Sequence, residues 1–495
     1  MKRSGTEGVQ QVLFVASEIY PLIKTGGLAD VVHALARALG GLGLEVRCLV
    51  PGYPAVVRGL ESRSIVAGIP HLFGGPARLL EGNAAGCRVL AIEAAHLYDR
   101  PGNPYTGPGH GDWPDNDRRF AALARVGAEI GRGHLISFQP EVVHAHDWQA
   151  GLTPAYLALE GGPRPATVQT IHNLAFQGIF PADRLASLGL PAEAFTIDGL
   201  EYWGQINFLK AGLVYADRLT TVSPTYAREI LKPGAGSGLE GVLAARRSDL
   251  FGILNGIDER DWNPASDPYL PAAFDHDRLD QRAASKAALQ ARFGLARAPD
   301  RPLLGAVARL TWQKGLDLLP AASARWLAAG GQMALILSDG DEAQEAVFRG
   351  LVKAHPGQVG VSFGTEEARS HLVQAGSDVV IVPSRYEPCG LTQLYALRYG
   401  AVPVVSRVGG LADSVIDANG AALDDGVATG IVFGPVTADA LADALDRALE
   451  LYARPERWRA LQHRGMTRRF GWESSHAARR YLDLYQRLVD RGPTP

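Results

Sequence analysis

Short apolar runs alternate with stretches of helical periodicity along most of the 495 residues. An apolar run of four to six residues is typical of a strand buried on both faces of a parallel sheet. Apolar residues spaced three or four apart between these runs predict the connecting helices. The first half contains the predicted strands 12–16, 45–50, 88–93, 141–145, 167–171, 218–222 and 252–254. The second half contains 303–308, 333–337, 359–363, 379–382, 402–405 and 430–433.

The repeated strand–helix order is interrupted once, at residues 259–300, where a polar, proline-bearing stretch precedes a predicted surface helix at 279–293. A chain of this length exceeds what one core usually supports. We therefore expect an α/β protein with two Rossmann-like domains, residues 11–258 and 301–471, joined by a linker region at 259–300. Ligands of such sheets bind at the carboxyl ends of the strands, so we expect a central cleft between the two domains. Residues 1–10 are expected to be a flexible N-terminus.

The composition is that of a soluble globular protein, with 46% hydrophobic and 20% charged residues. No apolar run is long enough to span a membrane, and the net charge of −3 argues against a nucleic-acid surface. Residues 1–10 lack the apolar segment of a secretory signal. The three cysteines, Cys48, Cys87 and Cys389, are an odd and widely spaced set, which predicts a cytoplasmic protein without disulfides.

A pair of glycines follows one predicted strand in each half. Gly26 and Gly27 precede a predicted helix after the first strand, in a segment without the G-x-G-x-x-G or Walker patterns, so no dinucleotide or P-loop site is predicted. Lys24 either meets an anion at the mouth of this helix or is a solvated loop residue. The same five residues, Gly-Gly-Leu-Ala-Asp, recur at 409–413 between a strand and a helix.

Charged side chains follow several of the predicted strands. Glu387 follows the strand 379–382 and precedes a predicted helix start at 390–393. The free N–H groups of a helix start suit a phosphate, so the acid and the helix are placed to bind a sugar and a phosphate together. The alternative is an ordinary strand–loop–helix with a solvated glutamate. Arg309 and Lys314 are placed to hold a diphosphate, with a surface ion pair as the alternative.

No metal site is predicted. His144 and His146 share one face of a strand, yet no third histidine follows at the spacing of a zinc site, so hydrogen-bonding roles are favoured. Asp339 and Asp341 flank a glycine, which predicts a turn rather than a magnesium site. The segment 96–117 is rich in Gly, Pro and aromatic residues, and a loop of this length is predicted to be functional.

Six motifs together resemble the family of bacterial glycogen synthases and plant starch synthases. They fall in the family's order within roughly residues 11–485, and they are Lys24–Asp30, His144–Trp148, Thr170–Asn173, Asn255–Asp258, Arg309–Gly315 and Glu387–Gln393. The resemblance implies a GT-B fold and a retaining transfer of glucose, without metal or cofactor, from ADP-glucose to the non-reducing-end 4-hydroxyl of an α-1,4-glucan. It also implies that residues 472–495 carry a C-terminal helix that crosses back to the first domain.

The resemblance further implies a role for each matching residue. The residues expected to contact the donor are Lys24, Gly27, Asn255, Thr365, Gly390, Leu391 and Thr392. The residues expected to carry the reaction are Glu387, His172, Arg309, Lys314 and Asp147. The residues expected on the acceptor side are Tyr98 and Trp148.

The chain departs from the family pattern at a few positions. Thr365 stands where the family often has an aromatic residue to stack on adenine, which leaves UDP-glucose open as the donor. Gln149 replaces an acceptor-side histidine, and Ser338 replaces a glycine. A non-catalytic glucan-binding regulator is the other alternative, and a glucan phosphorylase is disfavoured because no pyridoxal-phosphate lysine motif is present. Neither nucleic acid nor membrane is an expected partner, and the sequence does not predict an oligomeric state.

Overall fold

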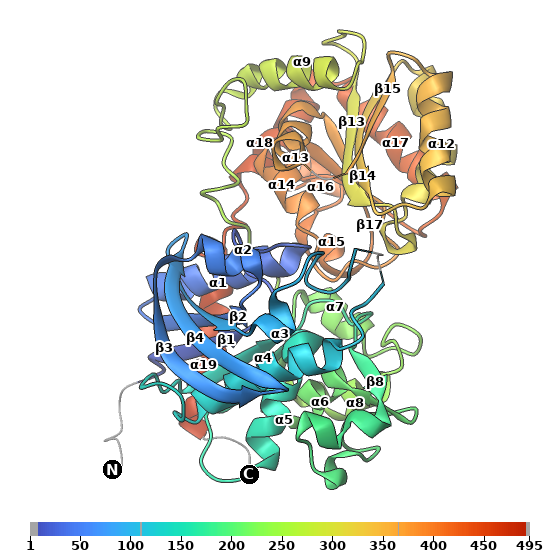
Figure 1. The fold of residues 1–495 in the computed structure, drawn as a ribbon. Helices are drawn as coiled ribbons and strands as arrows, with labels where there is room; N and C mark the ends of the chain where they lie inside the picture. The colour runs from blue at the N-terminus through green and yellow to red at the C-terminus, as the bar shows by residue number, and fades with distance from the viewer. Residues whose placement is uncertain (1–7, 109–110, 365, 492–495) are drawn as a thin grey trace. The chain divides into compact units, whose positions relative to one another are not determined.

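The computed structural model describes residues 8–108, 111–364 and 366–491, and the chain forms two compact units. The first unit comprises Met1–Gly256 together with Trp472–Pro495, and the second comprises Ile257–Gly471. Each unit is built on its own sheet with helices packed against it (Figure 1).

The first unit contains a nine-stranded sheet in the order β12-β11-β7-β6-β1-β2-β5-β4-β3. The strands from β12 to β5 pair in parallel, an arrangement that requires crossover connections, and most of these connections contain helices. The bounds of these parallel strands are β1 Gln11–Val15, β2 Glu45–Pro51, β5 Cys87–Glu93, β6 Val142–His146, β7 Ala166–Ile171, β11 Arg218–Thr221 and β12 Leu250–Gly252.

Two long antiparallel strands that the sequence pattern did not predict extend this sheet, β3 (Glu61–Leu72) and β4 (Gly75–Ala84) (Figure 1). Most side chains of β3 are exposed, and the strand contains a glycine, a proline and three register shifts against β4. Its apolar stretch 65–69 is interrupted by Gly68 and followed by Pro70, two residues that argue against a strand in a sequence, so this edge strand was missed.

Helices of the first unit pack on the sheet through apolar and small residues. The main ones are α1 Gly27–Gly41, α4 Asn116–Gly131, α5 Leu152–Leu159, α6 Phe208–Tyr215 and α19 Ala477–Arg491. α19 comes from the far end of the chain and contacts α1. Its residues Tyr481, Leu484, Tyr485 and Leu488 are buried in the core of the first unit. A small sheet in the order β8-β10-β9 (β8 Ile179–Pro181, β9 Glu201–Tyr202, β10 Gln205–Asn207) also belongs to this unit.

The second unit contains a fully parallel six-stranded sheet in the order β15-β14-β13-β16-β17-β18. Helices α12 (Glu342–Ala354) and α17 (Ala438–Tyr452) lie on one side of the sheet, and α13 (Glu367–Gly376) and α14 (Thr392–Arg398) on the other (Figure 1). The strands are β13 Leu303–Arg309, β14 Gln332–Ser338, β15 Val359–Phe363, β16 Val379–Val382, β17 Val402–Ser406 and β18 Ile431–Phe433. All six match the apolar runs of the second half.

The segment 259–300 is part of the second unit. It ends in helix α9 (Arg282–Arg292), whose Arg282 and Lys286 are buried near Asp378, with Lys286 Nζ 2.7 Å from the carboxylate. Asp267 accepts hydrogen bonds from His371 and from the Tyr399 hydroxyl, at 2.7 and 2.6 Å. This segment therefore packs as part of the domain rather than as a loose connection. In the described ranges, none of the helices has the length and apolar character needed to cross a bilayer.

Candidate active site

In the first unit, the segment between β1 and α1 presents Lys24 at the start of a helix. The Lys24 ammonium lies 2.8 Å from the Asp30 carboxylate and 5.6 Å from the centre of the Tyr20 ring, and its side chain is 39% exposed. Gly26 precedes α1 in an extended conformation, and a Cβ on it would contact nothing within 4 Å. This helix start therefore combines free N–H groups, open space and an accessible cation, as an anion site requires.

A buried carboxylate that the sequence interpretation did not single out holds this segment in place. Glu18 is 2% exposed and accepts hydrogen bonds from the Thr25 N–H, from the Thr25 hydroxyl (2.6 Å) and from the Tyr105 hydroxyl. Burial raises the pKa of Glu18, against the lowering effect of these donors. Tyr105 belongs to the segment 96–117, so that loop has an anchor in the Lys24 region. The only signal in the sequence is an acid placed directly after a buried strand.

The histidines of β6 are buried and hydrogen-bonded. His144 Nδ1 lies 2.7 Å from the Tyr485 hydroxyl and His144 Nε2 lies 2.5 Å from Thr170 Oγ1, so both ring nitrogens have partners. His146 Nδ1 lies 2.9 Å from Nε2 of His172, which follows β7. Burial lowers the pKa of His172 to about 3 and that of His146 well below its ordinary value, so both imidazoles are neutral at physiological pH.

Asp147 links the ends of β6 and β7. Its backbone adopts φ +56°, a conformation that is unfavourable for a non-glycine residue and that occurs preferentially at functional sites. The carboxylate accepts from the backbone N–H groups of His172 (2.7 Å) and Asn173 (3.4 Å), which sets the path of the chain after β7. Burial raises the pKa of Asp147 to about 7 even though these two donors lower it.

The remaining expected residues of the first unit differ in accessibility. Trp148 is half-buried, with its ring centre 4.8 Å from that of Phe120 in an edge-on contact. Asn255 is buried, and its Oδ1 has no hydrogen-bond donor in the described part of the chain. Tyr98 is a correction: it is completely buried, and its hydroxyl donates to the Arg119 carbonyl at 2.6 Å. A side chain that is fully buried and already hydrogen-bonded leaves no surface for direct contact with a glucan.

In the second unit, a short ion pair joins two loops. Lys314 Nζ lies 2.6 Å from Glu387 Oε2, which also accepts from the Ser384 hydroxyl at 2.9 Å. Glu387 is 5% exposed, and its other oxygen, Oε1, receives no hydrogen bond from any group in the described ranges. One carboxylate oxygen is thus fixed by the protein, and the other remains available to a ligand.

Contacts between residues 312–317 and 384–387 keep Lys314 and Glu387 together. Arg385 forms a bidentate pair with Asp317, both bonds 2.7 Å long, and donates to the Trp312 carbonyl. The Arg385 N–H donates to the Gln313 carbonyl at 2.8 Å. Bidentate guanidinium–carboxylate pairs fix orientation as well as distance, so the Lys314–Glu387 geometry is set by its neighbours.

Arg309 is the last residue of β13 and is half-buried. Among the described residues its guanidinium forms neither a hydrogen bond nor an ion pair, although its charge acts on the nearby Tyr386 hydroxyl and lowers the pKa of that group, which burial raises. A guanidinium that is partly desolvated and lacks an anion is placed to receive one.

The loop after Glu387 is built around Gly390 and Gln393. Gly390 has φ +70°, and the Gln393 side chain donates to the carbonyls of Cys389 (3.1 Å) and Gly390 (2.9 Å). Helix α14 then begins at Thr392, so the N–H groups at Leu391 and Thr392 lie at a helix start, where they have no acceptor within the helix. This is the arrangement expected for phosphate binding.

The second Gly-Gly-Leu-Ala-Asp segment lies directly against this loop. Gly409 has φ +41°, and a Cβ there would lie 1.8 Å from the Glu387 carbonyl oxygen. A Cβ on Gly410 would lie 2.2 Å from the Cys389 carbonyl oxygen, and the Gly410 N–H donates to the Glu387 carbonyl at 3.1 Å. Both glycines are needed because two stretches of backbone touch here, a reason that spacing alone does not reveal.

Several other positions have structural explanations. Asp341 accepts from the Gln344 N–H at 2.7 Å and caps α12, in a turn where Asp339 has φ +53°. Thr365, expected to contact the donor base, lies outside the described residues. Within the described ranges, one cluster of three side chains has ligand atoms close enough together to hold a metal ion. It consists of His276, Asp277 and His463, which are all exposed and are not expected site residues.

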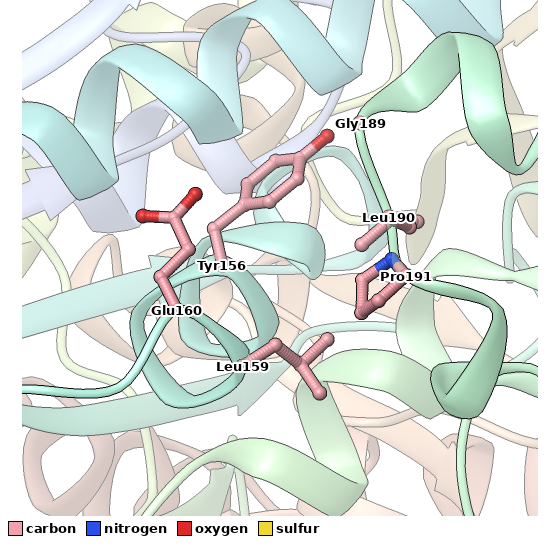
Figure 2. A pocket seen from close by; sticks show the side chains of 6 residues that line it. All are labelled: Tyr156, Leu159, Glu160, Gly189, Leu190 and Pro191. Atoms are coloured by element: carbon pink, nitrogen blue, oxygen red, sulfur yellow. The ribbon is translucent and has the colours of Figure 1, made fainter.

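A shallow hollow lies elsewhere on the first unit, between α5 and the segment that follows Leu188 (Figure 2). Its lining residues are Tyr156, Leu159, Glu160, Gly189, Leu190 and Pro191. The Tyr156 hydroxyl is already bound to the Leu188 carbonyl at 2.6 Å, and Glu160 pairs with Arg125. None of the residues expected to act on a substrate lines this hollow.

Comparison with known sequences finds a matching protein family for each half of the chain. Residues 11–245 match the starch synthase catalytic domain, and residues 289–462 match glycosyl transferases group 1. The chain is 57% identical over 477 residues to the glycogen synthase of Rhodopseudomonas palustris strain BisB18, covering 96% of this chain and 97% of that protein. It is 53% identical over 478 residues to the glycogen synthase of Methylocella silvestris, covering 97% and 98%.

Solved structures agree with this placement. The catalytic domain of starch synthase IV from Arabidopsis thaliana, bound to ADP and acarbose, has a TM-score of 0.89 and 33% identity, covering 98% of this chain and 100% of that chain. Sucrose-phosphate synthase from Thermosynechococcus elongatus matches with a TM-score of 0.59 and 19% identity over 98% and 100% of the two chains, which is a likeness of fold. The expected α/β class with two Rossmann-like units of GT-B type is confirmed.

Proposed function

The chain belongs to the family of glycogen and starch synthases, and from this premise we propose that it transfers glucose, with retention, from ADP-glucose to the non-reducing-end 4-hydroxyl of an α-1,4-glucan. One observation carries the proposal. Glu387 is buried with one oxygen held by Lys314 and Ser384 and the other open, while Arg309 has no anionic partner among the described residues. This set can bind a sugar hydroxyl and a phosphate at the same time.

The cations and the helix start act on the leaving nucleotide. Negative charge grows on the phosphate as its bond to the glucose breaks, and fixed positive groups stabilise that charge most where water is excluded. Arg309 offers up to two parallel hydrogen bonds and Lys314 a compact charge. The N–H groups at Leu391 and Thr392, after the turn at Gly390, bind the distal phosphate. With these groups present, the reaction has no need of a metal ion.

Glu387 orients the glucose. Its Oε2 is already occupied by two donors, so Oε1 accepts from the hydroxyls of the donor sugar. The ion pair with Lys314 holds this carboxylate in place, and hydrogen bonds to a charged acceptor are the strong ones. Retention then follows from attack on the same face of the ring as the departing phosphate, whose oxygen takes the proton of the incoming hydroxyl.

Residues of the first unit have their own roles in this proposal. Lys24 and the backbone at Gly27 contact the donor diphosphate at the start of α1. Asn255, whose buried Oδ1 has no hydrogen-bond donor in the described part of the chain, is the further donor contact of this unit. His172 contacts the donor glucose. Asp147 and Trp148 lie on the acceptor side, where Asp147 also fixes the backbone of His172.

The direct test is incubation with glycogen and either ADP-glucose or UDP-glucose, with nucleotide release as the readout. We expect release of ADP in excess of UDP, and the same rate with EDTA. Equal use of UDP-glucose would refute the donor assignment alone. Loss of activity in EDTA that magnesium restores would refute the metal-free mechanism. Absence of any transfer from either donor would refute the proposed function.

A further inference from the structure

His146 has no role in the transfer proposed above, yet it makes the only hydrogen bond that any described group makes to the ring of His172. It is completely buried in β6, and its Nδ1 lies 2.9 Å from His172 Nε2. Nε2 of His146 is buried and has no hydrogen-bond partner in the described part of the chain. Nδ1 of His172 is neither buried nor engaged by a described group. The pair thus has one shared contact, one enclosed nitrogen and one open nitrogen.

Counting protons decides how this pair is arranged. Both imidazoles are neutral, so each carries one N–H, and only one proton lies between the two rings. If His172 donated through Nε2, His146 would carry its own proton on the enclosed Nε2. A buried N–H without an acceptor costs about 1–3 kcal/mol and is rare in folded proteins. If His146 donates through Nδ1, the enclosed nitrogen holds only a lone pair and every N–H is satisfied or open.

The ring of His146 is fixed by a layer of aromatic side chains. His144 stacks on it with ring centres 4.1 Å apart, and Phe14 contacts it edge-on at 4.9 Å. His144 cannot rotate freely because Tyr485 of α19 and Thr170 of β7 hold its two nitrogens. A fixed ring presents the same nitrogen to His172 at all times.

We propose that His146 is a positioning residue that sets the tautomer of His172, so that His172 presents Nδ1–H as a hydrogen-bond donor to a sugar oxygen. This inference rests on the proposed function for the identity of the ligand. The tautomer itself follows from the protein alone. A neutral imidazole in this state donates and does not accept at its open nitrogen. His172 therefore donates to an oxygen lone pair of the donor glucose and does not accept from its hydroxyls.

The first test is nitrogen NMR of the full chain labelled with ¹⁵N-histidine, without any substrate. Long-range ¹H–¹⁵N correlations show which ring nitrogen carries the proton, and His172→Asn and His146→Asn spectra assign the signals among the 13 histidines. We expect Nδ1–H on both His146 and His172. A proton on Nε2 of His172 overturns the proposal. Because no substrate is present, this result is independent of whether the chain uses ADP-glucose.

The second test compares two substitutions of His146. His146→Asn keeps an N–H close to the position of Nδ1, whereas His146→Leu removes it. We expect His146→Leu to lose on the order of 10- to 100-fold in kcat, as for one weakened hydrogen bond in the transition state, with ADP affinity unchanged. His146→Asn should recover most of that loss and retain the Nδ1–H signal of His172. The exposed His134, replaced by Asn, is the control.

Two outcomes of this comparison overturn the proposal. One is an equal loss of kcat in His146→Asn and His146→Leu while the His172 signal stays at Nδ1–H in both. The other is full activity of His146→Leu. If His146→Leu is too unstable for kinetics, the His172 tautomer in His146→Asn decides, since that variant preserves the shape of the buried site. Inactivity of the parent chain on both nucleotide sugars would refute the proposed function and would leave the NMR result intact.

Discussion

The two Gly-Gly-Leu-Ala-Asp segments have the same sequence and differ in what their glycines meet. At 26–30 the segment opens α1, a helix of 15 residues, and a Cβ on Gly26 would contact nothing within 4 Å. At 409–413 it forms α15, a helix of only six residues (Gly409–Ser414), and both glycines touch the backbone of the Glu387 loop. The space beside Gly26 is therefore open, whereas the space beside Gly409 and Gly410 is occupied by backbone atoms.

Each copy is also accompanied by a buried carboxylate of a different kind. Glu18 lies beside the first copy, receives hydrogen bonds from neutral donors, and forms no ion pair with a described residue. Glu387 lies beside the second copy, and its charge is compensated by Lys314. Glu18 uses both oxygens to hold the loop, whereas Glu387 keeps one oxygen open. The comparison indicates that a repeated motif does not imply a repeated role, because the role depends on what packs against it.

The largest expected effect is that of Gly409→Ala. A methyl group would lie 1.8 Å from the Glu387 carbonyl oxygen, and φ +41° is itself unfavourable for alanine. Strain and overpacking together cost about 3 kcal/mol, which lowers the thermal midpoint of this unit by roughly 6–12 °C. Displacement of the Glu387 loop should reduce kcat/KM by more than about 10³-fold, as for loss of a catalytic group. Thermal unfolding and an ADP-glucose transfer assay measure the two effects.

The matched control for this change is Gly350→Ala within α12, where a Cβ would contact nothing within 4 Å. Alanine is a better helix former than glycine, so this variant should be fully active and slightly more stable. A Gly409→Ala protein with parental stability and activity would show that the close backbone contact is not required.

The second prediction concerns the open oxygen of Glu387. Glu387→Gln keeps the shape and removes the charge, and charge-assisted hydrogen bonds contribute roughly 1.5–3 kcal/mol each. We expect a loss of about 10²–10³ in kcat/KM, mostly in kcat, and a larger loss in Glu387→Ala. ADP should bind both variants nearly as tightly as the parent, and Glu342→Gln on exposed α12 should be unaffected. A glucosyl adduct on Glu387, detected by mass spectrometry, would show that it is a nucleophile instead.

The sequence was sufficient for most of the fold. Every parallel strand of the second unit coincides with an apolar run, because a strand buried on both faces has no polar positions to obscure it. The antiparallel β3 and β4 were not predicted. In Glu61–Leu72 the short apolar stretch 65–69 is interrupted by Gly68 and followed by Pro70, which argue against a strand. The segment 259–300 was expected as a linker from its polar composition. Its packing depends on buried ion pairs such as Lys286–Asp378, which hydrophobic periodicity does not register.

The sequence identified the residues that are proposed to contact the substrate. It did not reveal the contacts between residues distant in sequence that hold those residues in place. Lys314 and Glu387 are 73 positions apart, and the structure joins them at 2.6 Å. Tyr98 was placed on the acceptor side by family resemblance alone, and its burial beneath Arg119 contradicts a direct contact. Glu18 was not singled out, and His146 was given only a hydrogen-bonding role without a partner. The partners, Tyr105 and His172, come from segments that only the fold brings near.

The third prediction tests the open space at the first copy. Gly26→Ala should fold normally, since the backbone is extended and the added methyl group meets nothing. The cost at this helix cap should stay below about 1 kcal/mol. If the donor diphosphate approaches this helix start, the methyl group should weaken ADP binding by about tenfold, that is about 1.4 kcal/mol. Titration calorimetry with ADP measures this, and Gly40→Ala near the end of α1 is the control. Unchanged ADP affinity would remove Gly26 from the donor site.

The smallest expected effect is the pH dependence that Glu18 contributes. Burial raises the pKa of its carboxyl, so the folded chain holds the proton to a higher pH than the unfolded chain does. Ionisation therefore favours unfolding, and this contribution to stability, complete below the ordinary pKa near 4.5, is lost as the pH rises through the folded value. Glu18→Gln cannot ionise but can still accept from Thr25. Its thermal midpoint should equal that of the parent at low pH and exceed it by roughly 1–3 °C at pH 8, which is less than about 1 kcal/mol. Differential scanning calorimetry of both proteins from pH 4 to pH 8, with the exposed Glu193→Gln as the control, measures the difference. A midpoint of Glu18→Gln that falls further below the parent as the pH rises would mean that the ionised carboxylate stabilises the loop, and the contrast with the Lys314-paired Glu387 would then disappear.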